Sequence, residues 1–101
     1  MIIRGTTPEM TFSLPFECDL LDAAFIIVKQ LGATIIEKEL SDCTYDGMVL
    51  HVRLSQEDTL KLAANAPATI SIVVKTSSGD RFENKTAINV EVADTSKGGV
   101  I

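Results

Sequence analysis

The fold of this chain is decided by the stretch Asp42-Cys43-Thr44-Tyr45-Asp46-Gly47-Met48-Val49-Leu50-His51-Val52-Arg53-Leu54-Ser55-Gln56-Glu57-Asp58-Thr59-Leu60. Asp46-Gly47 predicts a hairpin turn, because glycine reaches positive φ without a Cβ clash and aspartate tolerates it. Every second residue from Met48 to Leu54 is apolar, which predicts a strand with one face toward a core. Ser55 and Asp58 have the spacing of a capping box, which predicts a short helical turn after the strand.

Further strands are predicted on both sides of this stretch. The same alternation of apolar residues predicts strands at 10–14, 68–76 and 88–92. Ser77-Ser78-Gly79-Asp80 predicts a hairpin turn, and the return strand that begins at Arg81 and Phe82 is expected to break or bulge around 83–85. Good helix formers at 57–64 stop before Pro67, so we expect a surface crossing of about two turns there.

Residues 19–32 fit two structures. Their apolar residues fall on one helical face, Asp19 is a candidate N-cap, and Gly32 is a candidate stop. Against a helix, the run Phe25-Ile26-Ile27-Val28 is aromatic and β-branched, which suits a strand. Leu31-Gly32 occupies the place of a hairpin connection before 34–39, although it is not an Asn-Gly turn. We favour a strand hairpin with at most one helical turn at 19–22, and the helix stays open as the alternative.

Together these segments predict the fold class. The chain has 101 residues, and a chain of this size buries about 60 to 70% of its unfolded surface, enough for one two-layer core. Several short strands, strong turn signals and one short helical crossing predict an all-β, antiparallel, immunoglobulin-like β-sandwich. We expect residues 1–101 to form a single domain, with 93–101 as a flexible tail.

Composition limits the partners and the compartment. The net charge is −5, and the nine lysines and arginines are scattered, so we expect no nucleic-acid partner. The longest apolar run, 23–28, is far shorter than the roughly 20 residues of a membrane-spanning helix, so we expect no membrane partner. The first eight residues lack the apolar region of a signal peptide, so we expect the chain to fold in the cytoplasm.

Candidate catalytic chemistry is sparse. His51 is the single histidine and falls on the mostly polar face of its strand, with no partner spaced for catalysis or metal binding. The acids of the turns lack the spacing of a calcium loop, and no phosphate loop or Ser/His/Asp set is recognisable. We therefore expect no catalytic, metal-binding or cofactor-binding residues and no cofactor, and an enzyme is the weakest hypothesis.

Candidate interaction residues are four apolar side chains in exposed settings. Val49 and Val73 are apolar positions on otherwise polar strand faces. Val100 and Ile101 follow a glycine pair and could add to the sheet edge of a neighbour. A frayed terminus explains Val100 and Ile101 equally well.

A family resemblance adds a function. The start Arg4-Gly5-Thr6-Thr7-Pro8 and the segment Phe12-Ser13-Leu14-Pro15-Phe16 resemble a family of small proteins encoded among tailed-phage and prophage genes of Gram-positive bacteria. The same is true of Asp42-Cys43-Thr44, of 54–60 and of Gly99-Val100-Ile101. No one of these segments is specific, and it is their succession along nearly the whole chain that carries the resemblance.

The resemblance implies a non-enzymatic structural protein associated with the phage tail or baseplate. Such a protein would act through contacts with other phage structural proteins, with a homo-oligomer as a further possibility. It would be present in the host cytoplasm during assembly and then in the virion. The alternative from another class is a carbohydrate-binding or host-surface adhesion module, which requires an exposed aromatic or acidic pocket.

Overall fold

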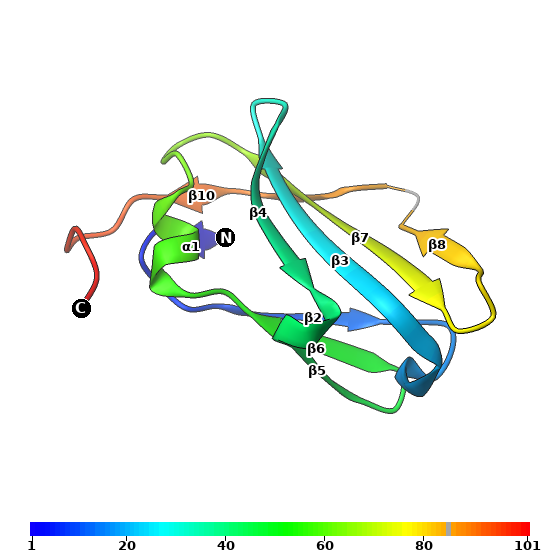
Figure 1. The fold of residues 1–101 in the computed structure, drawn as a ribbon. Coiled ribbons are helices and arrows are strands. Elements are labelled where there is room, and N and C mark those ends of the chain that lie inside the picture. Colours follow the sequence, from blue (N-terminus) through cyan, green and yellow to red (C-terminus); the bar gives the residue numbers. More distant parts are fainter. Residues whose placement is uncertain (85) are drawn as a thin grey trace.

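A computed structural model describes residues 1–84 and 86–101 (Figure 1). The elements of the described residues are β1 (Ile2–Ile3), β2 (Glu9–Ser13), the 3-10 turn η1 (Cys18–Leu20), β3 (Leu21–Gln30), β4 (Ala33–Glu39), the 3-10 turn η2 (Leu40–Asp42), β5 (Cys43–Asp46), β6 (Val49–Arg53), α1 (Gln56–Leu60), β7 (Ala68–Thr76), β8 (Arg81–Glu83), β9 (Ile88–Val90) and β10 (Val92–Ala93).

These strands form two antiparallel sheets. One sheet has the order β2-β6-β5, and the other has the order β4-β3-β7-β8, with β9 also paired to β7. A parallel pair of β1 and β10 joins the two ends of the described chain. The prediction of an all-β antiparallel sandwich with one short helical crossing is confirmed.

The order of strands inside the sheets is particular to this chain. In constant immunoglobulin domains the second strand pairs with the first and the fifth. Here the second long strand, β3, does not pair with the first long strand, β2. It lies in the other sheet, where it pairs with β4 and β7. The hairpin of β3 and β4 therefore stays whole within one sheet, and η2 carries the chain across to β5.

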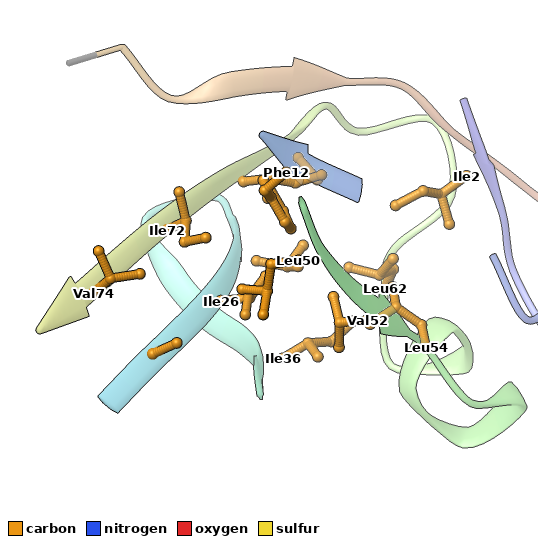
Figure 2. Close-up of a cluster of buried hydrophobic side chains, with 14 of the residues drawn as sticks. Ile2, Phe12, Ile26, Ile36, Leu50, Val52, Leu54, Leu62, Ile72 and Val74 are labelled. Carbon is orange, nitrogen blue, oxygen red and sulfur yellow. The ribbon is translucent and has the colours of Figure 1, made fainter. Parts of the chain in front are cut away.

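The core lies between the two sheets (Figure 2). The alternation predicted for residues 48–54 places Leu50, Val52 and Leu54 in it, each at most 2% exposed. The inward faces of β3 and β7 supply the facing layer, which contains Ala24, Ile26, Val28, Ile70, Ile72 and Val74. Burial of these alternate positions fixes the register of both sheets.

Residues 19–32 form the strand hairpin that we favoured, preceded by the single turn η1. Gln30 pairs with Ala33, so Leu31 and Gly32 are the two loop residues. Both have positive φ, 53° and 80°, which is the conformation of a type I′ hairpin turn. The turn therefore exists without the Asn-Gly sequence that usually specifies it.

The capping box is also confirmed. Asp58 N donates to Ser55 Oγ at 3.1 Å, and Ser55 N donates to Asp58 Oδ2 at 2.9 Å. The helix α1 ends at Leu60, sooner than the expected crossing over 57–64. Gln30 explains the shorter helix, because its buried side chain donates to the carbonyls of Ala63 and Ala66 and holds that loop in a non-helical course.

Two local predictions are wrong. Asp46 pairs with Val49 as the last residue of β5, so the turn residues are Gly47 and Met48 rather than Asp46 and Gly47. Gly47 alone has positive φ there, the requirement of a type II′ turn. Ile88, expected on the core face, is exposed on β9, a short strand that pairs with β7 at the edge of the sheet.

The predicted break after β8 is present at Asn84, and Lys85 lies outside the described residues. Asn84 Oδ1 accepts a hydrogen bond from Ile72 N at 2.9 Å, and Asn84 N donates to Ile72 O. Its Nδ2 donates to Thr86 O at 2.9 Å. The side chain thus continues the pairing of β7 where the backbone of β8 leaves it.

Candidate functional site

The predicted residues Val49 and Val73 lie on opposite outer faces of the sandwich. Val49 begins β6 and pairs with Ser13 and Asp46, while Val73 is central in β7 and pairs with Phe25 and Glu83. Both valines are half-buried. They belong to different sheets, so they do not form one surface.

The predicted residues Val100 and Ile101 are exposed, and the chain around them is anchored. Gln56 Oε1 accepts from Ile101 N at 2.7 Å, and Gln56 Nε2 donates to Ile101 O at 2.9 Å. At the start of the same segment, Arg4 Nη1 lies 2.8 Å from Asp94 Oδ1. Residues 94–101 form no strand, and these contacts fasten them beside α1.

His51 lies on the outer face of the three-stranded sheet. Its Nδ1 is 3.2 Å from Glu9 Oε1, but the geometry is not that of a hydrogen bond. The same carboxylate binds Arg53 at 3.0 Å. The cross-strand neighbours of His51 are Thr11 and Thr44.

Within residues 1–84 and 86–101, no group of three or more His, Cys, Asp or Glu side chains is placed to hold a metal ion. Within the same residues, no helix has the length and apolarity needed to cross a membrane.

A different surface gathers the features of a binding site. The segments 14–20, 45–48 and 77–83 meet at the end of the sandwich opposite the two termini and α1, on the right in Figure 1; we call this surface the loop end. Backbone hydrogen bonds join the segments: Leu14 N donates to Met48 O, Cys18 N to Gly47 O, and Ser77 N to Leu20 O, each at 2.8 Å.

The loop end exposes large apolar side chains from all three segments. The exposed fractions are 49% for Leu20, 47% for Tyr45, 42% for Met48 and 45% for Phe82. Single exposed apolar residues are common on soluble proteins, whereas a group of them at one place marks a contact surface. The loop end is therefore the main candidate functional site.

A cavity opens at this end between the two sheets. It is lined by Leu14, Pro15 and Phe16 after β2, by Ile72, Val74 and Phe82 of the other sheet, and by Ser13, Glu83 and Asn84, with a volume of about 230 Å³; we call it the apolar slot. The rings of Phe16 and Phe82, which both line the slot, have their centroids 5.4 Å apart and contact each other. Since an apolar cavity of about 150 Å³ can hold benzene, the slot has room for one aromatic or branched side chain.

The charged side chains of the loop end are mostly negative. Its five carboxylates, those of Glu17, Asp19, Asp46, Asp80 and Glu83, are all exposed. Arg81 is the one cationic side chain in the three segments, and it lies 4.0 Å from Glu83. Within the three segments the carboxylates outnumber the cations by four, and exposed Lys75, which pairs with Arg81 next to the hairpin, offsets part of this negative charge.

Cys18 lies within the loop end but carries no reactivity. Its side chain is buried, with 1% exposed. Burial, and then the charges of Glu17 and Asp19, raise the pKa of the thiol above its usual value. A thiol with a raised pKa is a poor nucleophile at neutral pH, so the loop end offers shape, apolar surface and charge rather than covalent chemistry.

Sequence reasoning missed the loop end, since Leu20, Met48 and Phe82 each looked like an ordinary loop or strand residue. Their three loops are distant in the sequence and meet only in the fold. Comparison with known proteins adds no identity: no family model, no curated protein and no solved structure matches this chain.

Proposed function

We propose that the chain is a non-enzymatic structural protein of a phage or prophage, associated with the tail or baseplate, and that it binds other virion proteins through the loop end. On this proposal it is made in the host cytoplasm and then built into the virion. The observation that carries the binding role is that the loop end exposes four large apolar side chains, those of Leu20, Tyr45, Met48 and Phe82, and that Phe82 also lines the apolar slot.

Two further features support the proposal. The succession of segments from Arg4-Gly5-Thr6-Thr7-Pro8 to Gly99-Val100-Ile101 resembles small phage-encoded proteins. The termini and α1 lie at the opposite end from the contact surface (Figure 1), so a partner at the loop end would meet no obstruction from either terminus. A rigid sandwich with binding loops at one end is a common arrangement for recognition.

The virion role is tested by particle composition. Phage particles induced from a strain that encodes the chain would be purified on a density gradient, and the chain would be quantified by mass spectrometry. We expect a fixed ratio to the tail proteins through successive purification steps. Loss of the chain from intact particles would overturn the virion role.

The loop-end contact is tested by a pair of matched variants in the same particles. Leu20→Ser combined with Met48→Ser removes two exposed apolar side chains of the loop end and should reduce incorporation by about tenfold or more. Leu31→Ser removes an apolar side chain that is 84% exposed on the distant β3–β4 turn and should leave incorporation unchanged. Equal incorporation of both variants would place the contact elsewhere.

A carbohydrate-binding module is the second candidate, because Tyr45 and Phe82 are half-exposed aromatic side chains at the loop end. Sugar sites also need polar groups that face the ligand. The amide of Asn84, the one carboxamide lining the slot, is already bonded to Ile72 N and Thr86 O. Binding on a glycan array that is lost in Tyr45→Ala would favour this candidate over a protein partner.

A further inference from the structure

We propose that the outer face of the larger sheet binds a second copy of this chain, whose strands cross those of the first copy at nearly a right angle. The face consists of the outward residues of β4, β3, β7 and β8, neighbouring strands of that sheet (Figure 1); we call it the β3–β7 face. The inference goes beyond the proposed contact with other virion proteins, because it concerns a different surface and a different partner.

The middle of the β3–β7 face is apolar. Ala23, Phe25 and Ile27 alternate with buried residues of β3, and Val73 of β7 pairs with Phe25. Phe25 is 37% exposed, and the other three are half-buried. The outer face of the three-stranded sheet differs, since in the described chain Val49 is its one large apolar side chain. An apolar centre with a charged border is the arrangement of a contact surface.

The border of the β3–β7 face separates its positive from its negative charges. Its paired positions hold three acids and three bases, all exposed: Glu37, Glu39, Glu83, Lys29, Lys75 and Arg81. Glu37 and Glu39 lie along the β4 edge, whereas Lys75 and Arg81 pair at the end of the face where β3 begins. Asp22, at the bulge of β3, has no paired position.

This separation makes the face complementary to itself in one orientation. Packed sheets have either nearly aligned or orthogonal strands. With aligned strands and a two-fold axis, Glu39 of one copy lies over an acid of the other, either Glu83 or Glu37. With orthogonal strands and an axis over Phe25 and Ser71, the acidic β4 edge of each copy lies over the Lys75 end of the other.

The orthogonal orientation also matches the remaining side chains. The register of the strands places Glu37 over Lys75 of the second copy, and Lys29 over Glu83. At the centre, Phe25 meets its own counterpart, and Val73 meets Ile27. A two-fold axis repeats each unlike contact, so the charges of one copy satisfy those of the other.

Both edges of this sheet disfavour pairing of strands between copies. β4 carries Lys38 on its inward side, bound to Asp58 at 2.6 Å, and an inward charge on an edge strand protects against edge-to-edge association. The opposite edge is interrupted at Asn84, between β8 and β9. The face, rather than an edge, is therefore where a second copy fits.

The size of the face sets the strength of the contact. Four strands about 4.8 Å apart and seven residues of about 3.3 Å give a plane of roughly 20 by 23 Å. Two such planes bury about 900 Å² in total, which is the size of a weak and reversible interface. We therefore expect a dimer with a dissociation constant of about 0.1 mM.

Sedimentation velocity of the full chain from about 10 μM to about 1 mM tests the dimer. We expect the sedimentation coefficient to rise with concentration toward that of a dimer. Phe25→Lys sets two cations opposite each other at the axis and should weaken association at least about tenfold. Val49→Lys, on the outer face of the other sheet, is the matched control and should change nothing. Circular dichroism verifies that both variants are folded.

A charge exchange tests the orientation. Glu37→Lys places a cation over Lys75 of the second copy, and Lys75→Glu places an anion over Glu37, so each variant alone should associate about tenfold more weakly. A mixture of the two variants should associate about as well as the unmodified chain, because both charge contacts of the mixed dimer are again between opposite charges. A merely structural effect of either substitution would not be rescued by mixing.

Four results would overturn the inference. A chain that stays monomeric to about 1 mM has no such contact, and growth beyond a dimer contradicts a closed two-fold pair. A mixture no more associated than its components excludes the orientation, and equal loss in Val49→Lys and Phe25→Lys excludes the face. Neither Glu37 nor Lys75 belongs to the loop end, and none of these measurements concerns phage particles, so the two proposals fail separately.

Discussion

At the scale of single residues, Leu31 holds a backbone conformation that few side chains adopt. Its φ is 53°. Its side chain is almost entirely exposed, so packing of the side chain does not offset the free-energy cost of this backbone conformation. The left-handed region costs a residue with a Cβ roughly 1–2 kcal/mol, and asparagine tolerates it better than leucine. The position is a local conflict between sequence and fold.

We predict that Leu31→Asn raises the free energy of unfolding by about 0.5–1 kcal/mol, which corresponds to a rise in Tm of a few degrees. Gly32→Ala is the matched control. A Cβ on Gly32 meets no atom within 4 Å, so only its φ of 80° opposes the substitution, and we expect a loss of about 1 kcal/mol. Thermal unfolding followed by circular dichroism measures both, and a lower Tm for Leu31→Asn would contradict the assigned turn.

At the scale of the elements, the side chain of Asn84 connects β7 to the segment between β8 and β9. β8 ends at Glu83 and β9 begins at Ile88, and Asn84 maintains the pairing of β7 in between. An asparagine can do this because its amide presents a donor and an acceptor, as a backbone peptide does. The break in the return strand is therefore a specific junction.

We predict that Asn84→Ala lowers the free energy of unfolding by about 1–2 kcal/mol, because the buried Ile72 N–H loses its acceptor. Hydrogen exchange at the Ile72 amide should accelerate in the same variant. Asn89→Ala, at an exposed position of β9, is the control and should change stability by less than about 0.5 kcal/mol. If urea unfolding gave equal losses for the two variants, the Asn84 junction would have no special role.

Strand identity could be read from the sequence because burial follows alternation. The β7 strand runs over the predicted 68–76, and the Phe25-Ile26-Ile27-Val28 run is a strand despite its helical periodicity. Chain direction could not be read in the same way. β4 and β5 both run toward the loop end, since η2 carries the chain between sheets without reversing it. If every pair of successive strands were assumed to form a hairpin, β5 would run away from the loop end, and the Gly47 turn would be placed at the opposite end of the sandwich.

At the scale of the whole molecule, one ion pair connects a sheet edge to the helical crossing. Lys38 of β4 points toward the core side, because it pairs with buried Ile26, and its Nζ lies 2.6 Å from Asp58 Oδ2 of α1. Both side chains are mostly buried. The pair could not be foreseen from the sequence, which identified Asp58 only as the partner of Ser55.

The pH dependence of stability follows from this pair. Burial by itself would raise the pKa of Asp58, but hydrogen bonds from Lys38 and Ser55 outweigh it and hold the pKa below the usual 3.8. A lowered pKa in the folded state means that the ionised carboxyl stabilises the fold above the unfolded pKa of about 3.9. That stabilisation is lost as pH falls through the lower, folded value.

We predict that Asp58→Asn costs about 1–3 kcal/mol at pH 7, through the loss of the ion pair and the weakened cap. The difference from the unmodified chain should shrink as pH falls below about 4, because Asp58 itself becomes protonated. Glu57→Gln, at the exposed neighbouring position, is the matched control and should change the free energy of unfolding at pH 7 by less than about 0.5 kcal/mol. Urea titrations between pH 2.5 and pH 7 test this, and a difference that stayed constant with pH would rule out the charged pair as its source.

The parallel pairing of β1 and β10 has a mechanical consequence. Ile2 N donates to Glu91 O at 2.8 Å, and Arg4 N donates to Ala93 O at 2.9 Å, so the first and last strands are bonded side by side. Because the strands run in the same direction, tension applied through residues 1 and 101 slides them past each other and loads both bonds together. An antiparallel pair pulled in this way would peel open one bond at a time. When the domain is stretched, the hydrogen bonds between β1 and β10 therefore resist the force together, in shear. The ion pair of Arg4 and Asp94 lies beside them.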